Sequence, residues 1–410
     1  MSTETPANPG YPRLNPSISF WLQGTRSSPL IGHRTTPTLP RPEDVQDVVI
    51  IGGGFSGVAT AYFLLTGENP PARVTLLEAR EVCDGATGRN GGHCRPAFAR
   101  YKKYKTNFGK EQAVKVIANE FETMRLVSQI VEKEKIDCDF YPTSTYDIME
   151  TISAAATYGE VYDELVTDGG IVEGIEIFRT PETAQAETGI VNAVAAYKWP
   201  AYTLWPYKLV AHLTQIALEK GLNLQTTTPV RSVTQAARDA QSDCRWEVHT
   251  DRGVVKARKV AYATNAYTAT LLPELGGPIY PLKDMLLRWS PRKAMPATAI
   301  ALRRATIRCV HPRCLFRLAF TTKQIDGSGD YFMQRPKDGI FIVGDGRESV
   351  NNDDLLRTTD DGTVLPVAVD ALKSRVRDAF GEARWGKEAL GEGLLVAWSG
   401  ECLLRLAFLK

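Results

Sequence analysis

A run of closely spaced glycines, GGGFSG at residues 52–57, is the part of the sequence whose residue types and spacing most directly suggest chemistry. In a G-x-G-x-x-G element the first glycine, here Gly52, permits a tight turn, and the second, Gly54, lets a pyrophosphate approach the backbone. The third, Gly57, lets a helix pack closely against a strand. Free N–H groups and the dipole at the start of that helix favour negative charge. The element predicts a dinucleotide site, with a merely structural glycine turn as the alternative.

A carboxylate lies at the place where a ribose would be recognised. Glu78 ends the apolar stretch 73–78, about 20 residues after the glycine motif. A carboxylate there can accept hydrogen bonds from both ribose hydroxyls of an adenosine. Because a glutamate would repel a 2′-phosphate, Glu78 disfavours NADP. An ordinary surface glutamate is the alternative interpretation.

A second glycine-dense loop, GATGRNGGH at residues 85–93, follows shortly after Glu78. A plain NAD-dependent dehydrogenase has no role for such a loop. Its exposed amides, with Arg89 and Asn90, suit contacts to phosphate and flavin oxygens. The loop therefore favours FAD over NAD, and a flexible surface loop is the alternative.

The segment EAR at residues 78–80 followed by this loop resembles the D-amino-acid-oxidase superfamily of FAD-dependent oxidoreductases, within it the gamma-glutamylputrescine-oxidase-like branch. Segments 228–230, 259–267 and 331–344 agree with the resemblance. It implies that the first of these faces the adenine and that the second closes over the dinucleotide, here with Asn265 in place of the usual glycine. The likeness covers most of residues 18–283 and 331–347, and residues 291–325 are unlike the family.

The resemblance implies a reaction in which the flavin takes a hydride from the carbon that bears the amine of a small amine or amino acid. The imine product would hydrolyse, and oxygen would reoxidise the flavin and give hydrogen peroxide. His93, which closes the second glycine loop, is the candidate catalytic residue; a plain hydrogen bond and a covalent flavin link are both open for it. Lys283, Arg288 and Arg335 are candidates to face a substrate carboxylate, with solvated surface charges as the alternative.

The residues expected to contact FAD come from both glycine loops, the acid between them and the two later segments. They are Gly52, Gly54, Phe55, Ser56, Gly57, Glu78, Ala79, Arg80, Gly85, Ala86, Thr87, Arg89, Asn90, Gly91, Gly92, Val230, Ala263, Thr264 and Asn265.

The elements that position these residues follow an α/β pattern. Residues 48–51 form a continuous apolar run typical of a strand buried on both faces of a parallel sheet. A helix over 58–65 and a strand over 73–78 complete a βαβ unit. We therefore expect a Rossmann-like FAD-binding domain of the glutathione-reductase type, interrupted by a smaller α+β substrate domain with a mixed or antiparallel sheet.

The expected domains are discontinuous along the chain. Residues 1–45 form an N-terminal arm, pinned to the body by Phe20 and Trp21; residues 46–138, 201–282 and 336–410 form the FAD-binding domain; residues 139–200 and 283–335 form the substrate domain. Within them the patterns predict helices over 105–135 and 207–220, strands over 140–149, 222–226, 230–233 and 259–263, and hairpins over 245–256 and 331–344.

The C-terminal residues 401–410 depart from the family pattern. Residues 397–400 resemble the start of the W-[ST]-G-I segment, after which family members have a strand and a glycine-rich turn. The resemblance implies that this turn donates N–H groups to the flavin C2 carbonyl, which stabilises the anionic reduced ring. Truncation or an altered reading frame would explain the departure. A non-catalytic FAD-binding protein is thus the alternative to an active oxidase, and an NAD-dependent dehydrogenase is a third reading that predicts a colourless protein.

Composition excludes several other classes. With 49 basic and 47 acidic residues the net charge is +2, which gives no general attraction to nucleic acid or to anionic membranes. No apolar run approaches the ~20 residues of a membrane-spanning helix, and the first residues lack a secretory signal pattern. The cysteines show no metal template, even where Cys309 and Cys314 flank His311. We expect a cytoplasmic protein without a metal, whose partner is a small molecule and whose oligomeric state the sequence leaves open.

Overall fold

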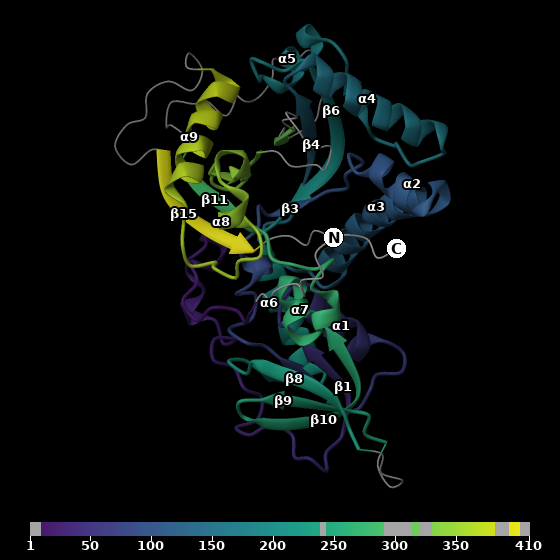
Figure 1. Ribbon diagram of the computed structural model, residues 1–410, viewed down its shortest axis with the longest axis vertical. Helices are drawn as coiled ribbons and strands as arrows, with labels where there is room; N and C mark the ends of the chain where they lie inside the picture. Colours follow the sequence, from purple (N-terminus) through teal and green to yellow (C-terminus); the bar gives the residue numbers. More distant parts are fainter. Residues whose placement is uncertain (1–9, 238–242, 291–313, 320–329, 382–392, 402–410) are drawn as a thin grey trace.

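The structure is a computed structural model of the chain and describes residues 10–237, 243–290, 314–319, 330–381 and 393–401. The described strands form two sheets, one of six strands and one of nine. The six-stranded sheet occupies the lower part of the view in Figure 1 and the nine-stranded sheet the upper part. This arrangement agrees with the expected fold class, a Rossmann-like unit beside a mixed second sheet.

The six-stranded sheet has the strand order β7-β2-β1-β10-β9-β8. Its strands are β1 (Gln46–Ile51), β2 (Val74–Leu77), β7 (Asn223–Gln225), β8 (Val230–Gln235), β9 (Trp246–Thr250) and β10 (Gly253–Tyr262). The first four strands in the order pair in parallel, and β9 and β8 extend the sheet with antiparallel pairs. Successive residues of β1 point to opposite faces: Val49 belongs to one buried cluster and Ile50 to another, so the strand is buried on both faces as predicted.

Strand β10 differs from the expected pattern. The sequence predicted a hairpin strand at 254–256 and a separate apolar strand at 259–263, whereas the structure has one continuous strand, β10. Its first half pairs antiparallel with β9 and its second half parallel with β1. Because β10 changes its hydrogen-bonded partner along its length, the charged residues Lys256, Arg258 and Lys259 lie within it without ending it.

The nine-stranded sheet has the order β15-β11-β14-β13-β12-β4-β6-β3, with β5 paired to β6. Its strands are β3 (His93–Cys94), β4 (Tyr141–Met149), β5 (Glu176–Phe178), β6 (Ala195–Thr203), β11 (Lys283–Ser290), β12 (Cys314–Ala319), β13 (Tyr331–Gln334), β14 (Phe341–Asp345) and β15 (Gly393–Glu401). The pair β12–β4 is parallel, and the pairs on either side of it are antiparallel. Strands β14 and β15, from the range 336–410 that the sequence division gives to the FAD-binding domain, are hydrogen-bonded within this nine-stranded sheet.

Helices cover both sheets. Their bounds are α1 (Phe55–Thr66), α2 (Tyr101–Phe108), α3 (Lys110–Lys133), α4 (Ile152–Thr167), α5 (Pro181–Thr188), α6 (Pro206–Glu219), α7 (Thr268–Leu271), α8 (Asn352–Leu355) and α9 (Pro366–Phe380). Short 3₁₀ turns occur at Phe20–Leu22, Thr25–Ser27, Ala86–Gly88, Asn265–Tyr267, Pro273–Leu275 and Arg347–Ser349. Helices α1 and α6 pack on each other beside the six-stranded sheet, and α9 lies against β11 and β14 of the other (Figure 1). The helices predicted over 105–135 and 207–220 are thereby confirmed.

The aromatic pair of the N-terminal arm is buried, as predicted. Phe20 and Trp21 join a cluster that includes Trp398 of β15 and other residues of the nine-stranded sheet. The Trp21 indole N–H donates to the carbonyl of Asn90, and the Trp205 indole N–H donates to the carbonyl of Trp21 over 2.9 Å. The arm is therefore fixed where the second glycine loop meets the nine-stranded sheet.

Two composition-based expectations can be compared with the described part of the chain. Within it, no helix combines the length and the apolar character needed to cross a bilayer. The same residues contain no group of three or more His, Cys, Asp or Glu side chains placed to hold a metal ion. Cys309 and His311 lie outside the described residues, as does most of the segment 291–325 apart from β12.

Candidate functional site

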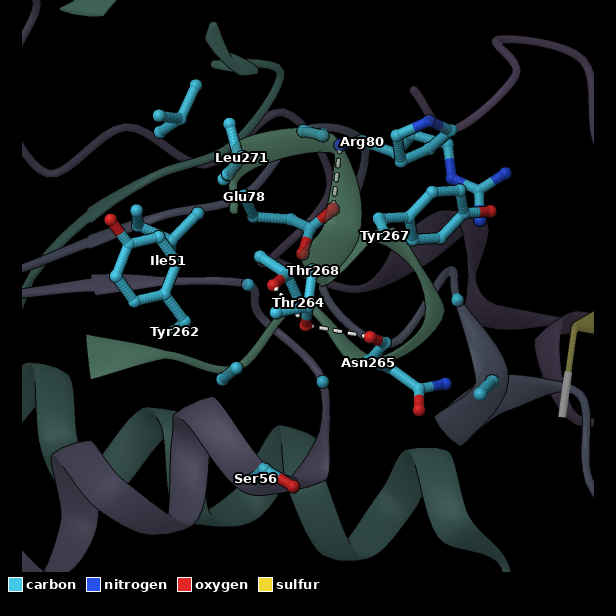
Figure 2. A pocket seen from close by; sticks show the side chains of 18 of the residues that line it. Ile51, Ser56, Glu78, Arg80, Tyr262, Thr264, Asn265, Tyr267, Thr268 and Leu271 are labelled. Atoms are coloured by element: carbon cyan, nitrogen blue, oxygen red, sulfur yellow. Dashed lines mark hydrogen bonds between the residues drawn. The ribbon is translucent and has the colours of Figure 1, made fainter. Parts of the chain in front are cut away.

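A cavity of about 590 Å³ opens at the edge of the six-stranded sheet where β1 and β2 end and α1 begins. This volume lies within the roughly 300–1,000 Å³ typical of small-molecule and cofactor sites. Figure 2 shows Glu78 in the middle of the wall, with Ile51 and Tyr262 to one side, Arg80 and Tyr267 to the other, and Ser56 on α1. The predicted residues that line it are Gly52, Gly54, Phe55, Ser56, Glu78, Ala79, Arg80, Gly85, Ala86, Thr87, Asn90, Val230, Ala263, Thr264 and Asn265.

The first glycine motif forms the floor of this cavity, and two of its glycines are required by close backbone packing. Gly52 has φ +109°, and a Cβ there would lie 2.5 Å from the carbonyl oxygen of Ala263. A Cβ on Gly57 would lie 1.9 Å from the carbonyl oxygen of Gly52, because α1 packs directly on the turn. Gly54 has an ordinary φ of −84°, and its missing side chain leaves the start of α1 open to the cavity. The N–H groups of that first turn have no acceptor within the helix, which suits them to bind phosphate oxygens.

Glu78 is held in place by backbone amides. Its Oε2 accepts a hydrogen bond from the N–H of Gly53 over 2.5 Å, and its Oε1 accepts one from the N–H of Arg80 over 2.7 Å. Burial raises the pKa of the Glu78 carboxyl, and these two N–H groups oppose the rise. The contacts fix the carboxyl group at the cavity wall, where its remaining acceptor capacity can serve a hydroxyl pair.

Arg80 lines the cavity, but carboxylates surround its guanidinium. It pairs with Asp361 over 2.8 Å and with Asp84 over 3.0 Å, and it donates to the carbonyl oxygens of Arg13 and Asp84. Burial lowers the pKa of Arg80, yet the two aspartates outweigh it and the pKa is raised overall. The side chain therefore ties the loop after β2 to distant segments.

The second glycine loop contributes to the same cavity through Gly85, Ala86, Thr87 and Asn90. The Thr87 hydroxyl oxygen accepts a hydrogen bond from the N–H of Phe55 over 2.8 Å, which links the two glycine loops at the start of α1. The Asn90 side chain braces its own loop: its Nδ2 donates to the carbonyls of Ala86 and Thr87, and its Oδ1 accepts from the N–H of Gly92.

Arg89, predicted to contact phosphate or flavin, lies in the protein interior. Its side chain is 1% exposed and lies outside the described cavity wall. It donates to the carbonyl of Asp84 over 2.8 Å, of Ser17 over 2.7 Å and of Ser399 over 3.0 Å. Burial lowers its pKa, and the nearby Asp361 and Asp84 oppose the change. Arg89 thus joins the loop to the N-terminal arm and to β15.

The last residues of the loop also lie outside the described cavity wall. Gly92 has φ +71°, and a Cβ on Gly91 would come within 2.5 Å of the Tyr331 ring. His93 begins β3, pairs with Thr203 of β6, and meets the Tyr331 ring edge-on at 5.3 Å between centroids. His93 is therefore placed between the loop and β13 of the nine-stranded sheet, outside the described cavity wall that the motif at 52–57 helps to form.

The three cations considered for a substrate carboxylate already have partners. Lys283 is 2% exposed and lies 3.2 Å from Asp360, and Arg335 is 4% exposed and lies 3.2 Å from Asp139. The reading of these two as solvated surface charges is wrong, because both are buried in ion pairs. Arg288 is half-buried, with its guanidinium 4.8 Å from the centre of the Phe20 ring.

Asn265 occupies a position where its residue type suits the backbone. It has φ +46°, in the left-handed region that asparagine tolerates better than most side chains do. Asparagine therefore fits the positive φ at the position where the similar family segment has a glycine. Thr264 next to it is hydrogen-bonded to Thr268 over 2.9 Å, which closes the turn into α7 (Figure 2).

Several cavity residues were not expected from the sequence. They are Tyr11, Pro12, Ile51, Leu77, Pro229, Tyr262, Tyr267, Thr268, Thr270, Leu271 and Ile279. Pro229, Tyr262 and Tyr267 lie in the segments 228–230 and 259–267, which the family resemblance had placed at the dinucleotide without singling out these residues. Tyr11 and Pro12 carry no local signal, since they reach the cavity only through the path of the folded arm.

A family model described as FAD dependent oxidoreductase matches residues 47–405. Gamma-glutamylputrescine oxidoreductase of Escherichia coli (strain K12) is 29% identical over 104 residues, which cover 25% of this chain and 24% of that protein. The probable oxidoreductase OrdL of Rhizobium meliloti (strain 1021) is 24% identical over 293 residues, 70% of this chain and 61% of that protein. The chain thus spans less than two thirds of the length of these curated relatives.

Solved structures share the fold at low identity. L-proline dehydrogenase from P. horikoshii has a TM-score of 0.59 at 18% identity, with 88% of this chain and 82% of that chain covered. L-amino acid deaminase from Proteus vulgaris, lacking its specific insertion sequence, has a TM-score of 0.61 at 17% identity, with 90% and 81% covered. At such identities the likeness shows the fold alone.

The cavity fits the cofactor of that family. Gly54 places no side chain between the start of α1 and the cavity, Glu78 is fixed on the wall by the N–H groups of Gly53 and Arg80, and residues of the second glycine loop line the same cavity. A flavin–adenine dinucleotide offers the phosphates, ribose and further chain that such a wall can bind. The cofactor is FAD. Because the family model matches residues 47–405, the chain belongs to the family of FAD-dependent oxidoreductases.

Proposed function

We propose that this chain oxidises the C–N bond of an amine or amino acid to an imine, with FAD as the electron acceptor and oxygen as the final acceptor, giving hydrogen peroxide. The observation that carries the proposal is the single cavity wall built from the motif at 52–57, Glu78 and the loop from Gly85, within a chain of the FAD-dependent family. The name of a curated relative supports the substrate class, since it is a gamma-glutamylputrescine oxidoreductase.

We assign the cofactor contacts along this wall. Bound FAD supplies the hydride acceptor, which is the chemically demanding part of the reaction. The amides at the start of α1 bind the pyrophosphate, and Glu78 accepts hydrogen bonds from the adenosine ribose. Val230 lies at the adenine end and the second glycine loop leads toward the flavin end. The remaining predicted residues do not contact FAD in this assignment; they hold the two loops in place through close packing and hydrogen bonds. They are Gly57, Arg89, Gly91 and Gly92.

The protein's task on the substrate side is to orient the amine and to keep it neutral. His93 is our candidate for a polar contact there, because it follows the second glycine loop directly and lies on β3 of the nine-stranded sheet. A hydrogen bond from its ring is the proposed role, in preference to a covalent link to the flavin. The edge-on contact with Tyr331 restricts the rotation of the imidazole.

An absorbance spectrum of the purified protein tests the proposal. We expect flavin bands near the wavelengths of free FAD, and we expect amines or amino acids to bleach them without air, with peroxide released in air. Bound FAD that no member of a broad amine panel reduces would refute the proposed reaction and favour a non-catalytic FAD-binding protein. A folded protein that takes up no FAD would refute the cofactor assignment itself. Replacing His93 by Ala should change the flavin spectrum or the turnover, and no change in either would remove it from the site.

Cytoplasmic location and the absence of a nucleic-acid partner stay as predictions. Expression of the tagged chain followed by cell fractionation tests the first of these.

A further inference from the structure

Residues 10–17, named here the strap, run along the rim of the FAD cavity. Tyr11 and Pro12 form part of the cavity wall together with Pro229 and Val230. The Tyr11 hydroxyl donates to the carbonyl of Arg231 over 2.8 Å, and the Arg231 guanidinium lies 4.6 Å from the centre of the Tyr11 ring. The strap thus brings an aromatic ring to the end of the cavity that lies away from the second glycine loop.

The contacts at the two ends of the strap differ in their exposure to solvent. At the Ser17 end, the N–H of Ser17 donates to the carbonyl of Asp361 over 2.8 Å, and the N–H of Ser399 donates to the Ser17 hydroxyl over 3.0 Å. Asp361 and Ser399 are almost fully buried. At the other end, Tyr11 is 36% exposed and its partner Arg231 is an exposed side chain. Water competes for exposed hydrogen bonds and screens exposed charges, so the Tyr11 end is the one that can detach.

One intermediate contact holds the strap to the loop after β2: Arg80 Nη1 donates to the carbonyl of Arg13 over 3.0 Å. At the Tyr11 end, the buried Thr270 hydroxyl donates to the carbonyl of Gly10 over 2.6 Å, so release of this end also breaks that hydrogen bond. Arg13 itself pairs with Asp360 over 3.2 Å on the surface. Because Arg80 also lines the cavity, one side chain of the cavity wall is hydrogen-bonded to the strap.

We propose that the strap closes the adenosine end of the FAD cavity, with Tyr11 as the aromatic wall that retains the adenine, and that its Tyr11 end must lift for FAD to enter or leave. Glu78 marks the ribose and α1 the phosphates, so the base lies beyond Glu78, toward the segment 229–231 that Tyr11 contacts. An aromatic face in such a wall favours stacking with a base. Pro12 restricts the backbone next to Tyr11, which lets the ring and the segment move together. The inference rests on FAD occupying this cavity and is independent of the substrate.

The test compares FAD dissociation from the wild-type chain and from three strap variants. FAD is followed by the recovery of its fluorescence after dilution of the loaded protein, and binding of ADP to the apoprotein is measured by calorimetry. We expect Tyr11→Ala to raise the FAD dissociation rate and to weaken ADP binding by about tenfold, as for loss of one stacked base. Tyr11→Phe keeps the ring and removes the hydroxyl contact to Arg231. Its FAD dissociation rate and ADP affinity should lie between those of Tyr11→Ala and those of wild type.

Leu14→Ala is the matched control, because Leu14 belongs to the same strap and is 85% exposed. This variant should keep the FAD dissociation rate and the ADP affinity within twofold of the wild-type values. Limited trypsin cleavage after Arg13 gives a second readout on the unmodified chain: FAD should slow this cleavage if the strap closes over it.

The outcomes separate the strap from the proposed function. If Tyr11→Ala has the FAD dissociation rate and the ADP affinity of wild type, the proposal that the strap closes the adenosine end is overturned. Equal losses in Tyr11→Ala and Leu14→Ala, or cleavage after Arg13 that ignores FAD, would overturn it as well. A wild-type chain that binds ADP but not FAD overturns the cofactor assignment, whereas FAD binding without amine oxidation overturns only the reaction.

Discussion

Replacing Gly54 by Ala should separate cofactor binding from folding more cleanly than any other change in the glycine motif. The backbone at Gly54 has φ −84°, which alanine adopts without strain. The nearest atom to the added methyl would be the Thr87 hydroxyl oxygen at 3.0 Å, on a side chain that can rotate. The apoprotein therefore loses at most the hydrogen bond from the N–H of Phe55 to that hydroxyl, about 1 kcal/mol.

The same methyl should weaken FAD binding much more. It stands at the open start of α1, where a pyrophosphate must come within hydrogen-bond distance of the backbone amides. Hydrogen bonds to a charged group contribute about 1.5–3 kcal/mol each, and loss of one such bond weakens binding roughly 10- to 100-fold. The expected change in FAD affinity thus exceeds the expected change in the free energy of unfolding of the apoprotein.

Fluorescence titration of apoprotein with FAD, beside urea denaturation of the same apoprotein, measures the two quantities. Gly277→Ala is the matched control, because Gly277 lies outside the described cavity wall and an added Cβ meets no described atom within 4 Å. Gly54→Ala protein that binds FAD as tightly as the control would refute the placement of the pyrophosphate. A large loss of apoprotein stability would refute the steric reasoning.

Three further changes test other parts of the fold. Gly57→Ala should destabilise the apoprotein by more than about 2 kcal/mol in urea denaturation, because its Cβ would lie 1.9 Å from the carbonyl oxygen of Gly52; an unchanged midpoint would contradict the packing of α1. Burial and the neighbouring Asp345 raise the pKa of the buried Asp284 carboxyl, so its contribution to stability is present below the ordinary carboxyl pKa and is lost as pH rises. Asp284→Asn should therefore have a free energy of unfolding higher than wild type at pH 9, by on the order of 1–3 kcal/mol, and a smaller increase at pH 5. Equal increases at the two pH values would contradict the proposed titration of Asp284. Trp21→Ala should cost about 3–5 kcal/mol of unfolding free energy, since the ring is fully buried; a loss under about 1 kcal/mol would mean that the arm is not part of the core.

Local patterns in the sequence were sufficient to predict the βαβ unit and the cofactor. The apolar run at 48–51, the glycine spacing and Glu78 each act over a few residues, and their geometry depends on backbone dihedrals and on one strand–helix packing contact. The helices over 101–133 and 206–219 and the hairpin of β13 and β14 were predictable for the same reason. Asn265 shows that even a departure from the family pattern keeps a local explanation, since asparagine accepts a positive φ.

Other features depend on which segments the fold brings together. Arg89 reads as a phosphate contact in the sequence, but the carbonyls of Ser17 and Ser399 surround its guanidinium only in the folded chain. For Lys283 and Arg335 the sequence left open a substrate contact or a solvated surface charge, and the structure buries both against aspartates far away in the sequence.

The sequence by itself determined the cofactor class, because the groups that bind a dinucleotide lie on two short loops separated by one strand. Only the tertiary structure decided which distant segments complete the cavity wall. Tyr11 reaches it from the arm by a hydrogen bond to Arg231, a residue distant along the chain. Contacts between residues so far apart in the sequence are set by the packing of whole sheets, and neither residue type nor local spacing carries that information.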